Sequence, residues 1–204
     1  MITNFIDTAG IIAYPLLIAA SAAVFMIIER AIVFLIKYRK LNKEKFLDDI
    51  KKFYSNNAKK NNIIKNKKGI TAEIYNEVLT KKPANKKEFD LYMDAEEVKE
   101  LPQLERGLGL LNFIAQISPT LGLLGTVSGM IKTFQVLGIG GSPEQMAIGI
   151  SEALFTTAAG LVISLPAAAF YHYYYAKIEK LTQQMQNLRL ETEAMLFTVN
   201  SEEE

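Results

Sequence analysis

Hydrophobic and polar residues alternate along this chain in long blocks. Three runs contain no charged residue: Ile11–Ile28, Gly107–Ile131 and Ala153–Ala176, of 18, 25 and 24 residues. A helix needs about 20 mainly apolar residues to cross the hydrocarbon core of a membrane, and about 17 is the lower limit. The pattern therefore predicts an all-α membrane protein with three transmembrane helices, the first of them running from about Asp7 to Ile36.

The basic residues are distributed very unevenly. Of the 23 Lys and Arg residues, 18 lie between Lys37 and Arg106, and none precedes Arg30. Because basic residues favour the cytoplasmic side, we expect an outer N-terminus, an inner loop and an inner C-terminal tail. The loop also holds 12 acidic residues. It is therefore interpreted as solvated cytoplasmic surface, with no binding of nucleic acid.

The polar blocks themselves contain helical patterns, which predict long helical extensions on the cytoplasmic side. Apolar residues at helical spacing predict short helices near residues 46–54 and 70–79, and a third that leads from residue 88 into the second membrane helix. The resulting division of the chain is an N-terminus with transmembrane helix 1 over 1–36, a cytoplasmic helical loop over 37–106, transmembrane helix 2 over 107–137, a short periplasmic turn over 138–147, transmembrane helix 3 over 148–175, and a cytoplasmic C-terminal helix and tail over 176–204.

Beyond the third apolar run, apolar residues repeat in steps of three and four. They form a seam of Ile178, Leu181, Met185, Leu188, Thr192 and Met195. Such a seam is typical of a coiled coil or helical bundle. Two alternatives follow, packing against the protein's own loop helices or against copies of itself. Four tyrosines at 171, 173, 174 and 175 precede the seam and indicate an aromatic belt at the inner membrane interface.

The second apolar run has one face made of small and hydroxylated residues. Within about 120° on a helical wheel lie Ser118, Gly122, Gly125, Thr126, Gly129, Lys132 and Thr133. Glycines four apart allow two helix backbones to touch, so Gly125 and Gly129 predict close packing. Thr126 has two readings, a bond to a carbonyl one turn earlier in its own helix or a place beside a polar path.

The third run has two small faces. One holds Gly149, Glu152, Thr156, Ala159 and Gly160, and the other holds Ala153, Thr157, Ser164 and Ala168. Two small faces indicate close neighbours on two sides, as in a ring of subunits. Pro166 is expected to kink or weaken this helix and to free the carbonyl near residue 162.

Charged groups are scarce within the last two runs. Glu152 lies near the outer end, where it is interpreted as a hydrated mouth residue or as an acid at a helix N-terminus. Lys132 either extends to the outer interface or pairs with Glu152. No carboxylate lies at mid-membrane, so a titrating group for proton transport would have to come from a partner. The chain has no Cys, and no nucleophile–base set or metal cluster stands out, which predicts no enzyme activity, cofactor or metal site.

Two segments carry a family resemblance: ISPTLGLLGTVSGMIKTF over residues 117–134 and GISEALFTTAAGLVISLPA over 149–167. They resemble the MotA/TolQ/ExbB proton channel family, and three spans with an outer N-terminus resemble its ExbB/TolQ branch. The resemblance implies a pentameric ring in the bacterial inner membrane, surrounding single-span partners of the ExbD/TolR type that supply a membrane aspartate. It also implies a TonB- or TolA-type energy transducer and use of the proton-motive force.

The resemblance assigns roles to four residues: Thr126 and Thr157 as lining of the ion path, Glu152 as the glutamate of the third helix, and Pro119 as the proline of the second. Glu152 and Thr157 lie about 140° apart on an ideal helix, so we expect Thr157 to face the pore and Glu152 the pore mouth or a neighbouring subunit. Glycines Gly122, Gly125, Gly129 and Gly160, with Pro119 and Pro166, are expected to serve helix packing.

Several alternatives stay open at this point. An ExbB-like role in TonB-dependent uptake is slightly favoured by the short chain and loop over a TolQ-like role in envelope maintenance. A non-conducting scaffold for partner helices would retain the glycines and be indifferent to Thr126 and Thr157. The transported ion is either H⁺ or Na⁺.

Overall fold

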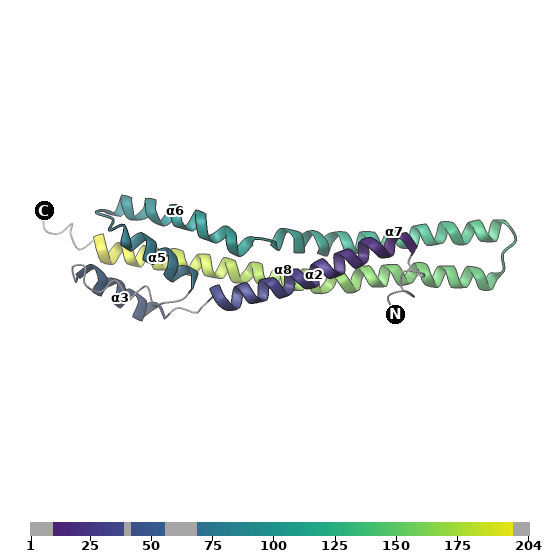
Figure 1. The fold of residues 1–204 in the computed structure, drawn as a ribbon, viewed down its shortest axis with the longest axis horizontal. Coiled ribbons are helices and arrows are strands. Elements are labelled where there is room, and N and C mark those ends of the chain that lie inside the picture. The colour runs from purple at the N-terminus through teal and green to yellow at the C-terminus, as the bar shows by residue number, and fades with distance from the viewer. Residues whose placement is uncertain (1–9, 39–41, 56–68, 198–204) are drawn as a thin grey trace. The chain divides into compact units, whose positions relative to one another are not determined.

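The computed structural model describes residues 10–38, 42–55 and 69–197, and within these ranges it contains helices and turns but no strand. The elements, shown in Figure 1, are the 3₁₀ turn η1 (Gly10–Ile12), α2 (Ala13–Lys37), α3 (Lys43–Ser55), α5 (Ile70–Thr80), α6 (Lys86–Glu105), α7 (Leu108–Gly138) and α8 (Pro143–Phe197). Three helical stretches are long and apolar enough to cross a membrane: Ala13–Lys37, Lys86–Gly138 and Pro143–Phe197. The predicted all-α membrane fold with three spanning helices is confirmed, and the pentameric ring stays a prediction.

Two helix starts differ from the predicted ones. The first membrane helix begins at Ala13 after a 3₁₀ turn, and Asp7 lies outside the described residues. Helix α8 begins at Pro143, five residues before the predicted start of the third membrane span at residue 148, and the bounds of that span stay a prediction. The Ser142 hydroxyl accepts from the Gln145 N–H at 3.4 Å, and the Gln145 side chain accepts from the Ser142 N–H at 3.0 Å. This reciprocal capping box, with proline at the first helical position, starts the helix early.

The described chain divides into two compact units. The first, here called the hairpin unit, comprises residues up to Glu29 together with Gly107–Tyr174. The second, here called the loop bundle, comprises Arg30–Arg106 together with the chain from Tyr175 onward. Helices α2 and α8 contribute residues to both units.

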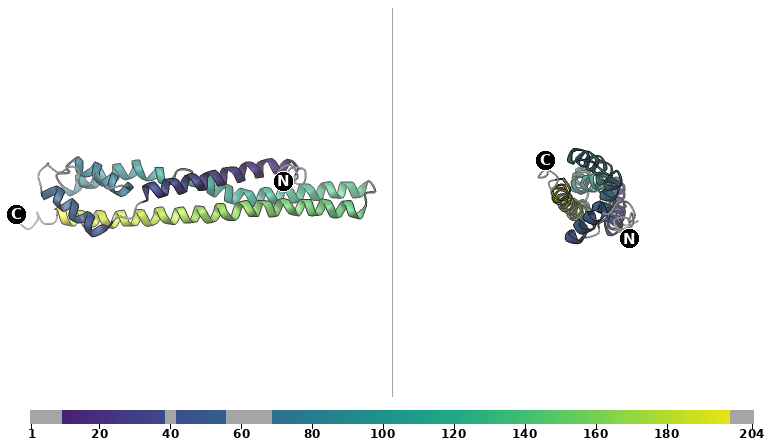
Figure 2. Two further views of the ribbon diagram at one scale, coloured as in Figure 1. Left: turned by 60° about the horizontal axis from the view of Figure 1, so that its bottom comes forward. Right: turned by 90° about the vertical axis from the view of Figure 1, so that its left-hand side faces the viewer.

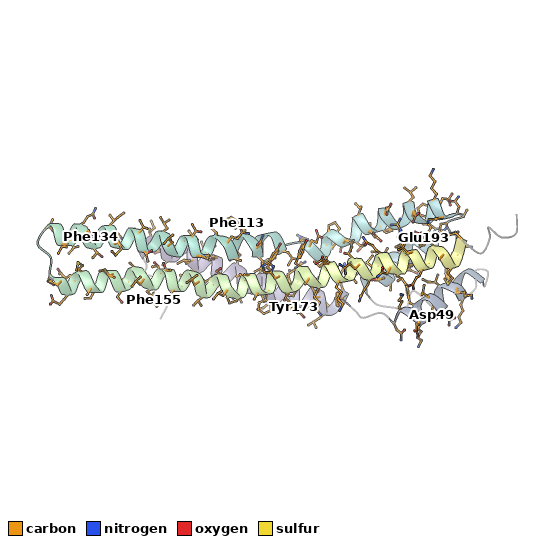
Figure 3. All side chains as sticks on the ribbon, turned by 180° about the vertical axis from the view of Figure 1, so that it is seen from behind. Asp49, Phe113, Phe134, Phe155, Tyr173 and Glu193 are labelled. Atoms are coloured by element: carbon orange, nitrogen blue, oxygen red, sulfur yellow. The ribbon has the colours of Figure 1, made fainter. Side chains whose placement is uncertain are left out.

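In the hairpin unit, α7 and the first part of α8 form an antiparallel hairpin, and α2 lies alongside it (Figures 1 and 2). Large apolar side chains on this unit point outward, among them Phe113, Phe134 and Phe155 (Figure 3). So extensive an exposed apolar surface fits contact with lipid or with other helices. Tyr174 is buried instead, and its hydroxyl donates to the carbonyl of Ile27 at 3.0 Å, which joins α8 to α2.

The loop bundle packs α3, α5 and α6 with the last part of α8 around an aromatic core. The ring of Tyr75 lies 5.3 Å from that of Phe46 and 6.4 Å from that of Phe89, both measured between centroids. The seam residues Ile178, Leu181, Met185, Leu188 and Thr192 are all buried. The described chain therefore shows the first of the two alternatives for this seam, packing against the protein's own loop helices.

Charged side chains join the elements of the loop bundle at several places, and two of them are largely buried. Arg189 of α8 reaches α6, where it pairs with Asp90 at 2.7 Å and with Asp94. Arg30, only 3% exposed, donates to the carbonyl oxygens of Gln103 at 3.1 Å and Leu104 at 3.3 Å. These carbonyls belong to the last turn of α6, where intrahelical donors run out, so Arg30 caps that helix.

The carboxyl of Glu97 in α6 loses hydration in this bundle without gaining hydrogen bonds that fully replace it. Among the described residues, its Oε1 atom is buried without a hydrogen-bond partner. Burial raises the pKa of the Glu97 carboxyl, the nearby Arg189 acts in the opposite direction, and Asp94 raises the pKa further. The folded protein therefore binds a proton at Glu97 more readily than the unfolded chain does. The pKa of a glutamate in an unfolded chain is about 4.3, so ionisation of Glu97 lowers the free energy of unfolding as pH rises above that value.

We expect Glu97→Gln to raise the thermal midpoint of the detergent-solubilised protein at pH 7.5, because the neutral amide removes a buried charge without a partner. The difference from wild type should shrink as pH falls toward 4, where Glu97 itself becomes neutral. Circular dichroism melting at several pH values measures this. The exposed Glu73→Gln is the matched control, and an equal effect of the two substitutions would contradict this account.

The α7–α8 hairpin as candidate functional site

Helices α7 and α8 approach each other so closely that backbone touches backbone. A Cβ atom placed on Gly122 would lie 2.8 Å from the carbonyl oxygen of Thr156 and 2.9 Å from the Cα of Thr157. One placed on Gly129 would lie 2.7 Å from the Cβ of Ala153. Gly125 lies in the same way against the Thr156 side chain, and Gly160 against the carbonyl of Ser118. All four glycines predicted to serve packing therefore lie at this one contact.

Two hydroxyl groups that sequence analysis left without a role bridge the helices at this contact. The Thr156 Oγ1 atom, in a side chain 2% exposed, lies 3.1 Å from the carbonyl oxygen of Gly122 across the contact and 2.7 Å from that of Ala153 in its own helix. The Ser164 hydroxyl donates to the carbonyl of Ala115 at 2.6 Å. Both were visible only as members of small faces in the sequence.

The bond from Ser164 has a specific cause in α7. Pro119 lies inside that helix and has no N–H to donate to the carbonyl four residues earlier, which is that of Ala115. In an apolar surrounding an unsatisfied carbonyl is costly, and another helix can supply the missing donor. Ser164 does so here. Helix α8 likewise continues through Pro166 without interruption.

Thr126 and Thr157 are brought together on another part of the same contact. Their hydroxyl oxygens lie 3.5 Å apart, and both side chains are partly exposed. The Thr126 hydroxyl donates to the carbonyl of Leu123 at 2.7 Å, so its oxygen is left to accept from Thr157. The hydroxyl of Thr126 thus bonds its own helix, and at the same time its oxygen stands beside a second hydroxyl at the hairpin surface. Whether the pair lines an ion path stays a prediction.

Glu152 and Lys132 line a separate cavity of about 310 Å³ in the hairpin unit. Thr156 and several glycines also line it, while Thr126 and Thr157 do not. Within the described residues no ion pair joins Lys132 to Glu152, although both face the same cavity. Of Glu152 and Thr157 only the glutamate lines this cavity, and the expectation that Thr157 faces a pore and Glu152 its mouth or a neighbouring subunit stays a prediction.

A close-packed helical hairpin, in a chain with three helices long and apolar enough to cross a membrane, defines a multi-pass helical membrane protein. Residues 64–187 match the MotA/TolQ/ExbB proton channel family, and the chain belongs to that family. The match confirms the resemblance drawn from residues 117–134 and 149–167, and it begins well before them, inside the loop.

Individual relatives agree with this assignment. Over 191 residues the chain is 33% identical to biopolymer transport protein ExbB-like 3 of Synechocystis sp., covering 87% of this chain and 90% of the relative. It is 51% identical over 70 residues to biopolymer transport protein exbB1 of Vibrio cholerae, covering 33% of this chain and 31% of the relative. It is 36% identical over 91 residues to the Tol-Pal system protein TolQ of Haemophilus influenzae, covering 44% and 40%.

We expect Gly122→Ala to destabilise the protein by about 1–3 kcal/mol, the usual range for overpacking a tight contact. Its new methyl group would meet the backbone of α8. Gly109→Ala in the same helix is the matched control, since a Cβ there meets nothing within 4 Å. Gly109→Ala should be neutral or stabilising, because alanine favours helix. Denaturant titration in detergent measures both, and a hairpin that tolerates Gly122→Ala as well as Gly109→Ala is not close-packed.

We expect Ser164→Ala to lower stability by about 1 kcal/mol, because it leaves the Ala115 carbonyl without a donor. In a Pro119→Ala background the same substitution should cost clearly less, since residue 119 then supplies its own N–H to that carbonyl. A double-mutant cycle on unfolding free energies measures the coupling. Additive costs of the two substitutions would show that the proline and the serine act independently.

Proposed function

We propose that this chain is the ring-forming subunit of a proton-driven stator in the bacterial inner membrane. Membership of a proton channel family supports the channel class, and the three apolar helices support a multi-pass membrane protein. In the proposal the N-terminus is periplasmic and the C-terminus cytoplasmic, as the distribution of basic residues favours. Five copies would surround single-span partners of the ExbD/TolR type, and a TonB- or TolA-type protein would carry the resulting movement outward.

The observation that carries the proposal is the threonine pair. Thr126 and Thr157 come from two different helices, stand 3.5 Å apart and remain partly exposed. Such a pair offers hydroxyl oxygens to a group that lies against the hairpin from outside the chain. A packing role alone requires neither hydroxyl, because Thr156 and Ser164 already bridge the helices.

The proton carrier itself would belong to the partner. Between Gly107 and Ser151 this chain has no carboxylate except Glu144, which lies at the start of α8, and Glu152 lines a different cavity. A partner aspartate, protonated from outside, would be neutral and move along the apolar ring wall. After releasing its proton on the cytoplasmic side, the aspartate would be charged and would accept hydrogen bonds from the hydroxyls of Thr126 and Thr157 or from water bound to them. Each crossing releases about 2.3 kcal/mol per 100 mV of membrane potential.

Within this proposal an ExbB-like role in TonB-dependent uptake is favoured. The relative that matches over most of its own length carries an ExbB-like name, whereas the TolQ match covers 40% of that relative. A TolQ-like role in envelope maintenance is the alternative. A non-conducting scaffold is a second alternative, and it would require the glycine contact but neither threonine hydroxyl.

The test is proton flux into liposomes that contain this chain together with its single-span partner. We expect partner-dependent flux in wild type and a loss of at least about tenfold in the Thr126→Val/Thr157→Val double variant, because two polar groups beside the carrier become apolar. Thr126→Ser/Thr157→Ser should retain most of the flux, since the hydroxyls remain.

The matched control is Thr120→Val, which removes an exposed threonine of the same helix. The Thr120 hydroxyl donates to the carbonyl of Gln116, one turn earlier in α7. Its flux should equal that of wild type. Full flux in an assembled Thr126→Val/Thr157→Val complex would overturn the hydroxyl role and favour the scaffold. Absence of proton flux from an intact wild-type complex would direct the same measurement to Na⁺.

A further inference from the structure

The cavity that holds Lys132 and Glu152 lies beside the start of α2, in the hairpin unit. The 3₁₀ turn η1 supplies Ile11 and Ile12 to its edge, and α7 and α8 form its walls. The hairpin extends past the first residues of α2 in Figures 1 and 2, so that, among the described residues, no helix covers this part of the α7–α8 groove. Glycines at 125, 129 and 149 supply the space, because they carry no side chain.

The cavity is lined by one positive and one negative side chain, which do not form an ion pair with each other among the described residues. Lys132, Glu152 and the hydroxyl of Ser128 all line it, and in the described part of the chain none of the three makes a hydrogen bond or ion pair. An ammonium and a carboxylate at a membrane surface each gain from a partner of opposite charge. A single ligand with both an anionic and a cationic end would satisfy the two together.

The level of the cavity suits the headgroup region of a bilayer. Lys132 precedes the end of α7 at Gly138 by six residues, and Glu152 follows the start of α8 at Pro143 by nine. At about 1.5 Å per residue these positions lie roughly 9 and 14 Å from the helix ends. The interfacial layer on each side of the hydrocarbon core is several ångströms thick, and a lysine side chain reaches several more.

An apolar strip leads away from the cavity along α2. Ile11, Tyr14 and Ile18 recur at helical spacing and are 76%, 56% and 68% exposed. Ile11 is also part of the cavity edge. A molecule whose polar end enters the cavity can therefore lay an acyl chain along this strip.

We propose that the cavity binds the headgroup of a phospholipid with a primary ammonium group, of the phosphatidylethanolamine class, from the leaflet on the side of the α7–α8 turn. The phosphate would lie at Lys132 and Ser128, and the ammonium at Glu152. A phosphoglycerol headgroup would satisfy the lysine and leave the glutamate unpaired. A choline headgroup has no N–H to donate. The ethanolamine headgroup matches both charges and donates hydrogen bonds to the carboxylate.

The test uses the purified full-length chain in detergent and three lipids with identical acyl chains, carrying ethanolamine, glycerol or choline headgroups. Native mass spectrometry counts the lipid retained per subunit. We expect wild type to retain the ethanolamine lipid in preference to both others. Glu152→Gln should abolish the preference over the phosphoglycerol lipid, and Lys132→Gln should weaken retention of both by about tenfold, the effect of one charge-assisted contact.

The matched control is Glu144→Gln, an exposed carboxylate on α8 that does not line the cavity, and it should behave as wild type. If a cavity variant fails to fold by size-exclusion chromatography, Ser128→Ala replaces it, with reduced retention of the ethanolamine and glycerol lipids expected. Equal retention of the three lipids by wild type, or an unchanged ethanolamine preference in folded Glu152→Gln, would overturn the proposal. The readout is binding and does not rest on proton conduction, so failure of the proposed function and failure of this site are distinguishable.

Discussion

The backbone contact between α7 and α8 is the constraint on which the rest of the hairpin depends. In lipid, two helices gain little from burying apolar surface against each other, so close van der Waals contact and hydrogen bonds must hold them. Glycine at 122, 125, 129 and 160 removes the side chains that would separate the helices. Only at this short separation can the Thr156 and Ser164 hydroxyls reach carbonyls of α7. The glycines and the hydroxyls are therefore parts of one arrangement.

This contact also divides the polar groups of the hairpin into two sets with different surroundings. Thr126 and Thr157 meet where both remain partly exposed, while Glu152 and Lys132 face a cavity that neither threonine reaches. A threonine hydroxyl is neutral, so placing it in an apolar environment costs little free energy. A charged side chain there requires water or a counter-charge. Along the hairpin, Thr126 and Thr157 thus lie farther from the α7–α8 turn than Lys132 and Glu152 do.

Sequence periodicity was sufficient for the three membrane helices and for the small-residue faces, because these depend on local composition. The start of α8 at Pro143 is also encoded locally, because the Ser-Pro-Glu-Gln sequence at 142–145 forms its capping box. The partner of Arg30 could not be predicted, since backbone carbonyls leave no sequence signal. The cavity likewise depends on where α2 begins relative to the hairpin. The carbonyl freed by Pro119 follows from the same rule that was applied to Pro166, and only its serine partner required the structure.

The hydrogen bond between Ser164 and the carbonyl freed by Pro119 limits how far α7 and α8 can slide past each other along their axes. Helices that touch only through glycine and alanine present a nearly uniform surface, along which one helix can shift past the other at little cost. A hydroxyl that bonds one particular carbonyl favours a single axial position, because a shift of one helical turn, about 5.4 Å, breaks the bond. The carbonyl freed by Pro119 thus fixes the axial register of α8 against α7 through its hydrogen bond with Ser164. The same register places Thr126 beside Thr157.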